Sequence, residues 1–68
     1  MQNDIIQGHW KEVKGKLKQQ WGKVTDDDLT RLKGTYEELE GLLQQRYGYA
    51  KAQADKAIDD FINRNQWH

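Results

Sequence analysis

Apolar residues recur along the first third of the chain at the three- and four-residue intervals expected of a helix that buries one face. The recurring positions are Ile6, Trp10, Val13, Leu17 and Trp21. This pattern predicts an amphipathic helix that starts after Asn3 or Asp4 and runs to Trp21. Gly22 follows directly, and we expect it to close the helix in the left-handed conformation that glycine adopts without a steric penalty.

Two further apolar stripes follow in the second half of the chain. The first comprises Tyr36, Leu39, Leu42, Leu43 and Tyr47, and it predicts a helix that is closed by Gly48. The second comprises Ala50, Ala54, Ala57, Ile58, Phe61 and Ile62, and it predicts a final helix over residues 50–63. Because alanine side chains are small, this last stripe indicates close packing against another helix.

A polar segment between the first two stripes has the sequence of a helix start. Thr25 stands where an N-cap residue is expected, and Asp28 follows three residues later, which is the spacing of a capping box. Val24 and Leu29 are placed to form a hydrophobic staple around this cap. We therefore expect a short helix over residues 26–33.

The same capping spacing recurs at Thr35 and Glu38, where the stripe from Tyr36 to Tyr47 begins. The three consecutive aspartates at residues 26–28 could instead hold a metal ion. A calcium loop, however, needs alternating oxygen ligands and a central glycine, whereas the helix dipole favours carboxylates in any first turn. We therefore interpret the aspartates as part of a helix start and predict no metal site.

The segment of residues 8–22, GHWKEVKGKLKQQWG, is repeated 26 positions later as GTYEELEGLLQQRYG in residues 34–48. Six of the fifteen aligned positions are identical, and three more hold similar apolar or aromatic residues. Because an internal repeat indicates a repeated structural unit, we predict a single all-α domain over residues 1–68. Its four short helices form two helical hairpins that are related by pseudo-twofold symmetry and packed orthogonally.

One alternative to the two hairpins remains open. Five apolar residues would also share one face of an uninterrupted helix that passes through Gly34. They are Leu29, Leu32, Tyr36, Leu39 and Leu43. The repeat favours the hairpins, because a helix that ends near Gly22 implies that the matching unit begins near Gly34.

The composition bounds the compartment and the chemistry of the protein. Its 68 residues include no cysteine, which excludes disulfides and zinc–thiolate sites. No segment approaches the roughly 20 apolar residues that span a bilayer, and the first residues lack the basic and apolar regions of a signal peptide. We therefore expect a cytoplasmic protein that does not enter membranes.

Eleven basic and eleven acidic residues cancel, but they are unevenly distributed. Basic side chains prevail over residues 1–24 and acidic ones over residues 25–45. This polarity is compatible with an anionic partner, with head-to-tail self-association, or simply with a solvated face. We expect a monomer or weak self-association.

Residues suited to catalysis are few. His9 and His68 are the only histidines, and neither has a carboxylate and a nucleophile at a recognisable catalytic spacing. The glycines follow no predicted strand and precede no GK[ST] sequence, so they do not form a phosphate-binding loop. The sequence predicts a protein that is not an enzyme and carries no cofactor.

The identical residues of the two copies include one glycine in the middle of each predicted helix, Gly15 and Gly41. A mid-helix glycine destabilises a helix by roughly 1 kcal/mol relative to alanine. The explanation we favour is that a second helix, or the C-terminal tail with Trp67, packs against these glycines. The other is a shallow groove that receives a partner and is flanked by Glu12, Gln19, Glu38 and Gln45. Replacing Gly15 with alanine separates the two explanations.

Two further features bear on binding. Lys11, Lys14 and Lys18 line one flank of the first predicted helix and could contact nucleic acid or another polyanion, although the zero net charge argues against this. Trp67 lies beyond the last predicted helix, where it either folds back as a lid or stays exposed. Of the three tryptophans, it is the one we expect to contact a partner.

These residues also carry a resemblance to a known family. The stretches GHWKEVKGKLKQQWGKVTDDDL, residues 8–29, and QQRYGYAKAQADKAIDDF, residues 44–61, resemble the CsbD-like family of small bacterial stress proteins. The resemblance covers essentially the whole chain. It implies an all-helical fold of CsbD-like or SAM-domain-like type and expression in the general stress response. It implies no catalytic residues, because the family has no established biochemical activity.

Our leading hypothesis is a non-enzymatic bacterial stress-response protein that acts by protein interaction or as a hydrophilic protectant. The protectant version is motivated by 32% charged residues and a mean hydropathy of −1.15. The alternative is a weak binder of nucleic acid or another polyanion through the lysine flank.

Overall fold

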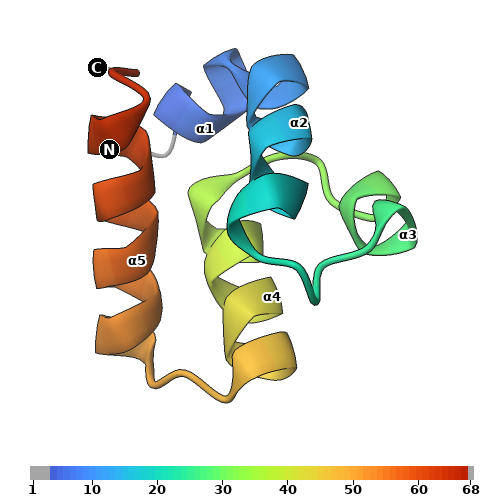
Figure 1. Cartoon of the computed structure of the whole chain (residues 1–68), viewed down its shortest axis with the longest axis vertical. Helices are drawn as coiled ribbons and strands as arrows, with labels where there is room; N and C mark the ends of the chain where they lie inside the picture. The colour runs from blue at the N-terminus through green and yellow to red at the C-terminus, as the bar shows by residue number, and fades with distance from the viewer. Residues whose placement is uncertain (1–3, 68) are drawn as a thin grey trace.

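A computed structural model describes residues 4–67 and shows five helices (Figure 1). They are α1 (Asp4–Gly8), α2 (Trp10–Gln20), α3 (Asp26–Thr30), α4 (Tyr36–Tyr47) and α5 (Lys51–Arg64). No strand occurs in this part of the chain, so the all-α prediction is confirmed, with five helices in place of four. In Figure 1, α4 and α5 run side by side in opposite directions, while α3 lies at the periphery.

The predicted apolar stripes meet in one hydrophobic core. Its buried members are Ile6, Val13, Leu17, Trp21, Val24, Leu29, Leu39, Leu42, Leu43, Ala54, Ile58, Phe61, Ile62 and Trp67. Trp21 of the first stripe packs edge-on against Phe61 of α5, with their ring centroids 5.1 Å apart. Full burial of a large apolar side chain stabilises a fold by about 1.5–3 kcal/mol. These side chains therefore hold the helices together.

Both predicted capping boxes are confirmed. Thr25 Oγ1 accepts a hydrogen bond from the backbone N–H of Asp28, and Asp28 Oδ2 accepts one from the N–H of Thr25, both at 3.1 Å. Thr35 and Glu38 form the same reciprocal pair at the start of α4. Partial burial opposes the ionisation of Glu38. Bonds from the N–H groups of Lys33, Gly34 and Thr35 outweigh this effect and lower its pKa.

The first predicted helix is interrupted at His9. This residue has φ −115° and ψ 24°, so α1 ends at Gly8 and α2 begins at Trp10. Gly8 has low helix propensity, and the side chain of His9 makes no capping hydrogen bond to the start of α2. The predicted single helix is therefore wrong at this point, although the apolar stripe continues across the interruption.

The predicted role of Gly22 is wrong. The chain leaves the helix one residue earlier, because Trp21 has an extended backbone with φ −126° and ψ 95°. Positive φ among the glycines of residues 4–67 occurs only at Gly34 (98°) and Gly48 (69°). Gly48 closes α4 in the left-handed conformation, as predicted.

The third helix ends at Thr30, before the predicted boundary at Lys33. Glu38 Oε1 accepts hydrogen bonds from the N–H groups of Lys33 and Gly34, at 2.8 and 3.0 Å. These two groups are therefore directed to the cap of α4 and cannot extend α3. The φ of Gly34 also rules out the uninterrupted helix through this residue. The pseudo-twofold, orthogonal arrangement of two hairpins stays a prediction.

Candidate functional site

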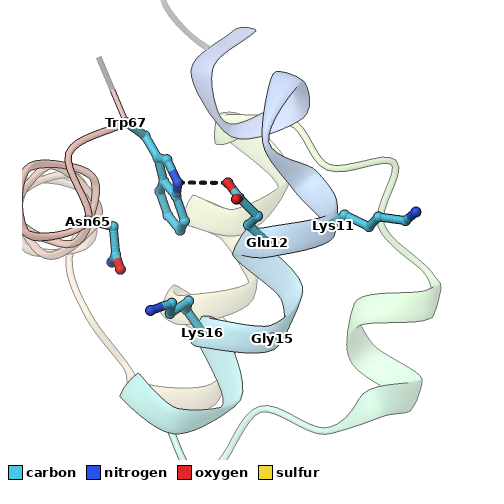
Figure 2. Close-up of a pocket in the computed structure, with 6 residues that line it drawn as sticks. All are labelled: Lys11, Glu12, Gly15, Lys16, Asn65 and Trp67. Carbon is cyan, nitrogen blue, oxygen red and sulfur yellow. Dashed lines mark hydrogen bonds between the residues drawn. The ribbon is translucent and has the colours of Figure 1, made fainter.

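An open groove of about 340 Å³ lies between α2 and the segment that follows α5. It is lined by Lys11, Glu12, Gly15, Lys16, Asn65 and Trp67 (Figure 2). Figure 2 shows Lys16 on the side of Asn65 and Trp67, while Lys11 extends on the other side of α2. The groove thus joins a helix of the first half of the chain to the C-terminal residues.

The turn after α5 brings Trp67 back over the core. The N–H of Gln66 bonds to Asn63 O at 3.1 Å and that of Trp67 to Ile62 O at 3.2 Å, which is the pattern of a Schellman motif. Gln66 has the left-handed φ of 60° that this motif requires. Trp67 is 7% exposed and packs edge-on against Phe61, so it folds back as a lid.

Glu12 fastens this lid to α2. The indole Nε1 of Trp67 donates a hydrogen bond to Glu12 Oε1 at 3.1 Å, as Figure 2 shows. The ring of His9 stacks on the indole with centroids 5.8 Å apart, and His9 Nδ1 lies 3.4 Å from Glu12 Oε1. Because Trp67 is largely buried, only its margin faces the groove.

Gly15 forms part of the groove wall without packing against anything. A Cβ atom at Gly15 would have no neighbouring heavy atom within 4 Å in the described structure, and the same holds for Gly41. The packing explanation that we favoured for these glycines is therefore wrong. The groove explanation stays a prediction, and Gly15 lies among the groove residues.

The structure brings together only part of the predicted partner surface. Gly15 and Trp67 line the groove, whereas Gln19, Gly41 and Gln45 are exposed residues outside its lining. Sequence reasoning missed Lys16 and Asn65 as groove residues. Asn65 caps the end of α5, and its place beside α2 depends on the turn that follows. For Lys16 the available signal was its adjacency to Gly15.

The predicted lysine flank is exposed on α2, as expected for Lys11, Lys14 and Lys18. Lys18 Nζ lies 2.6 Å from Asp26 Oδ1, so its charge is paired with the start of α3. Lys11 contributes to the groove instead. The three residues therefore do not act as one uniform basic strip.

The aspartates of α3 serve the helix start, as interpreted from the sequence. Asp28 is 5% exposed, accepts the capping bond from Thr25, and receives two hydrogen bonds from the guanidinium of Arg46. The bonds from Arg46, followed by that from the backbone of Thr25, lower the pKa of Asp28 to about 2. No group of three or more potential ligands within residues 4–67 is placed to hold a metal ion.

Each helix within the described range is too short, or too polar, to cross a bilayer. This agrees with the absence of a long apolar run in the sequence.

Comparison with known proteins defines the family. The family model described as CsbD-like matches residues 4–56. The UPF0337 protein YjbJ of Escherichia coli K12 is 49% identical over 67 residues, which cover 98% of this chain and 97% of the relative. A UPF0337 protein of Bordetella pertussis is 51% identical over 65 residues, covering 96% of this chain and 98% of that relative. The resemblance inferred from residues 8–29 and 44–61 is therefore confirmed, and the chain belongs to the CsbD-like family.

Proposed function

We propose that this protein acts in the bacterial general stress response without catalysing a reaction, by binding a segment of another protein in the groove beside Gly15. The observation that carries the proposal is the open position of Gly15. A glycine in the middle of an exposed helix destabilises it by roughly 1 kcal/mol, and here no packed neighbour requires the missing side chain. A partner that approaches the backbone closely would require it.

The groove residues indicate the chemistry of that partner. Lys16 extends its ammonium group on the side of Asn65 and Trp67, Lys11 lines the groove with its ammonium group on the other side of α2, and the carboxylate of Glu12 already accepts the indole N–H of Trp67. The margin of Trp67 adds an apolar contact at one end. We therefore infer an acidic segment with at least one apolar side chain as the ligand.

An amide-resolved NMR titration tests the proposal directly. The labelled protein receives lysate fractions from stressed bacteria at low salt, and we expect shifts at Gly15, Lys16 and the indole N–H of Trp67. Shifts confined to Lys11, Lys14 and Lys18 that also appear with duplex DNA and vanish with salt would replace this proposal with polyanion binding.

The composition favours a second candidate function, that of a hydrophilic protectant. A protein with 32% charged residues and a mean hydropathy of −1.15 is strongly hydrated even when its core is folded. An enzyme-protection assay under drying or heat, against an equal mass of an inert small protein, tests this candidate. Equal protection by both proteins rejects it.

A further inference from the structure

A polar cluster lies between α4 and α5, away from the groove. Glu40 of α4 is only 7% exposed although it carries a carboxyl group. Lys51 of α5 places its Nζ atom 3.2 Å from Glu40 Oε2 and 3.4 Å from Asp55 Oδ2. One ammonium group thus bridges two carboxyl groups that come from the two packed helices.

The second oxygen of Asp55 has no visible donor. Asp55 Oδ1 is buried and lacks a hydrogen-bond partner within the described part of the chain. Both carboxyl groups contact the same ammonium group, which brings them together across the α4–α5 contact, and Asp55 Oδ1 is the acceptor that a hydrogen bond from Glu40 would satisfy. Two ionised carboxylates are both acceptors, so such a bond requires a proton on one of them. A buried acceptor without a donor is unfavourable, and so are two adjacent negative charges with one cation.

We propose that Glu40 and Asp55 share one proton across the α4–α5 contact, which makes the packing of these two helices tighten as the pH falls. The proton resides mainly on Glu40 and forms the O–H that Asp55 Oδ1 otherwise lacks. When it is lost, the contact holds two negative charges and the single positive charge of Lys51. No ligand is needed for this response.

The other groups around the pair do not supply the missing proton. The hydroxyl of Tyr36 in α4 donates to the backbone oxygen of Asp55 at 3.2 Å and to Asp59 Oδ1 at 3.0 Å. Burial, together with Asp59, raises the pKa of Tyr36 above its usual value, so this hydroxyl stays neutral. Lys51 is mostly exposed and stays charged, since both carboxyl groups raise its pKa.

The direction of the pH response follows from the two carboxyl groups. The hydrogen bond with Asp55, followed by burial, raises the pKa of Glu40, and the same bond lowers the pKa of Asp55. A raised pKa means that the folded state binds the proton more tightly than the unfolded state does. Its stabilising effect is complete below the ordinary pKa of glutamate and is lost as the pH rises through the folded-state value.

The variant Glu40→Gln isolates this effect. Its amide can donate to Asp55 Oδ1 at every pH, so we expect a higher Tm than wild type at about pH 8 and a difference that shrinks toward about pH 5. Glu37→Gln is the matched control, because it removes an exposed carboxylate from the same helix. We expect its difference from wild type to change little over this range.

A carboxyl-resolved NMR titration of the wild-type protein gives a second, independent test. We expect the Glu40 signal to titrate at higher pH than an ordinary glutamate side chain. The proposal is overturned if Glu40 titrates with the exposed glutamates, or if Glu40→Gln and wild type show the same dependence of Tm on pH. Neither result would affect the proposed groove, which involves other residues.

Discussion

The two copies of the internal repeat share six of fifteen residues but use them differently. At the first position, Gly34 is buried with φ 98° against the indole of Trp10, whereas Gly8 is exposed at the end of α1. At the last position, Gly48 closes α4 with φ 69°, whereas Gly22 follows a helix that has already ended. Identity of sequence therefore does not imply identity of local structure.

The difference at the helix starts has a single-residue cause. Glu12 and Glu38 are identical in the alignment and both lie three residues after an N-cap. Thr35 offers Glu38 a reciprocal cap, but His9 caps nothing. Glu12 is consequently free to accept the indole N–H of Trp67.

The two copies of the repeated unit have different roles in the fold. In the second copy, the cap of α4 and the left-handed glycines determine the course of the backbone. The first copy leaves Glu12 and Gly15 on an exposed face, where the returning C-terminal residues complete a groove. The candidate site thus belongs to one copy only.

The largest effect is expected at the first position of the repeat. A Cβ atom on Gly34 would lie 2.7 Å from Trp10 Cδ2, and its φ of 98° strains any other residue. We expect Gly34→Ala to lower the free energy of unfolding by about 2–4 kcal/mol, measured by urea denaturation. Gly8→Ala is the matched control and has open space around it. An equal loss in both variants would contradict the contrast.

A smaller effect is expected at the N-caps. Thr35→Ala removes the acceptor for the N–H of Glu38, and we expect a loss of about 1–2 kcal/mol. His9→Ala removes no capping bond and loses only its contacts with Trp67 and Glu12. Equilibrium unfolding of the two variants measures the difference. A larger loss of stability in His9→Ala than in Thr35→Ala would contradict this. It would mean that this position of the repeat stabilises the fold more in the first copy than in the second.

The central glycines should behave alike in stability. No described atom lies near the Cβ position of either residue, so Gly15→Ala and Gly41→Ala should each stabilise the protein by about 1 kcal/mol. Thermal unfolding measures this gain. Destabilisation by Gly15→Ala alone would restore the packing explanation for the first copy.

A pH-dependent effect is expected where Gln20 of one copy aligns with Arg46 of the other. Arg46→Gln removes the guanidinium that lowers the pKa of Asp28 to about 2. A lowered pKa stabilises the fold above the ordinary aspartate pKa, and this contribution is lost as the pH falls through the folded-state value. The advantage of wild type over the variant should therefore vanish between about pH 4 and about pH 2. A carboxyl NMR titration in which Asp28 keeps its low pKa in the variant would refute the role of Arg46.

Features set by local spacing could be predicted from the sequence. The apolar stripes that end in Trp21 and Tyr47 need only a helical period, and the caps at Thr25 and Thr35 need only a three-residue interval. The left-handed turn at Gly48 is local in the same sense. Each of these predictions rested on residues within about one turn of each other.

Features that depend on contacts distant in sequence could not be predicted. Gly22 lost its expected role because Trp21, buried beside Phe61, leaves the helix early. The groove needs the turn at Gln66 to carry Trp67 back to Glu12, 55 positions away in the chain. Both copies contain the central glycine, so the glycines could not show which copy would face the C-terminal segment.

The groove is tested most directly by a matched pair of larger side chains. Gly15→Leu fills the groove, and Gly41→Leu places the same side chain on an equally open helix outside it. Both variants are titrated, beside wild type, with the stressed-cell lysate fraction and followed through the indole N–H signal of Trp67. We expect this signal to shift in wild type and Gly41→Leu but not in Gly15→Leu. Equal shifts in all three proteins, or no shift in wild type, would contradict this expectation.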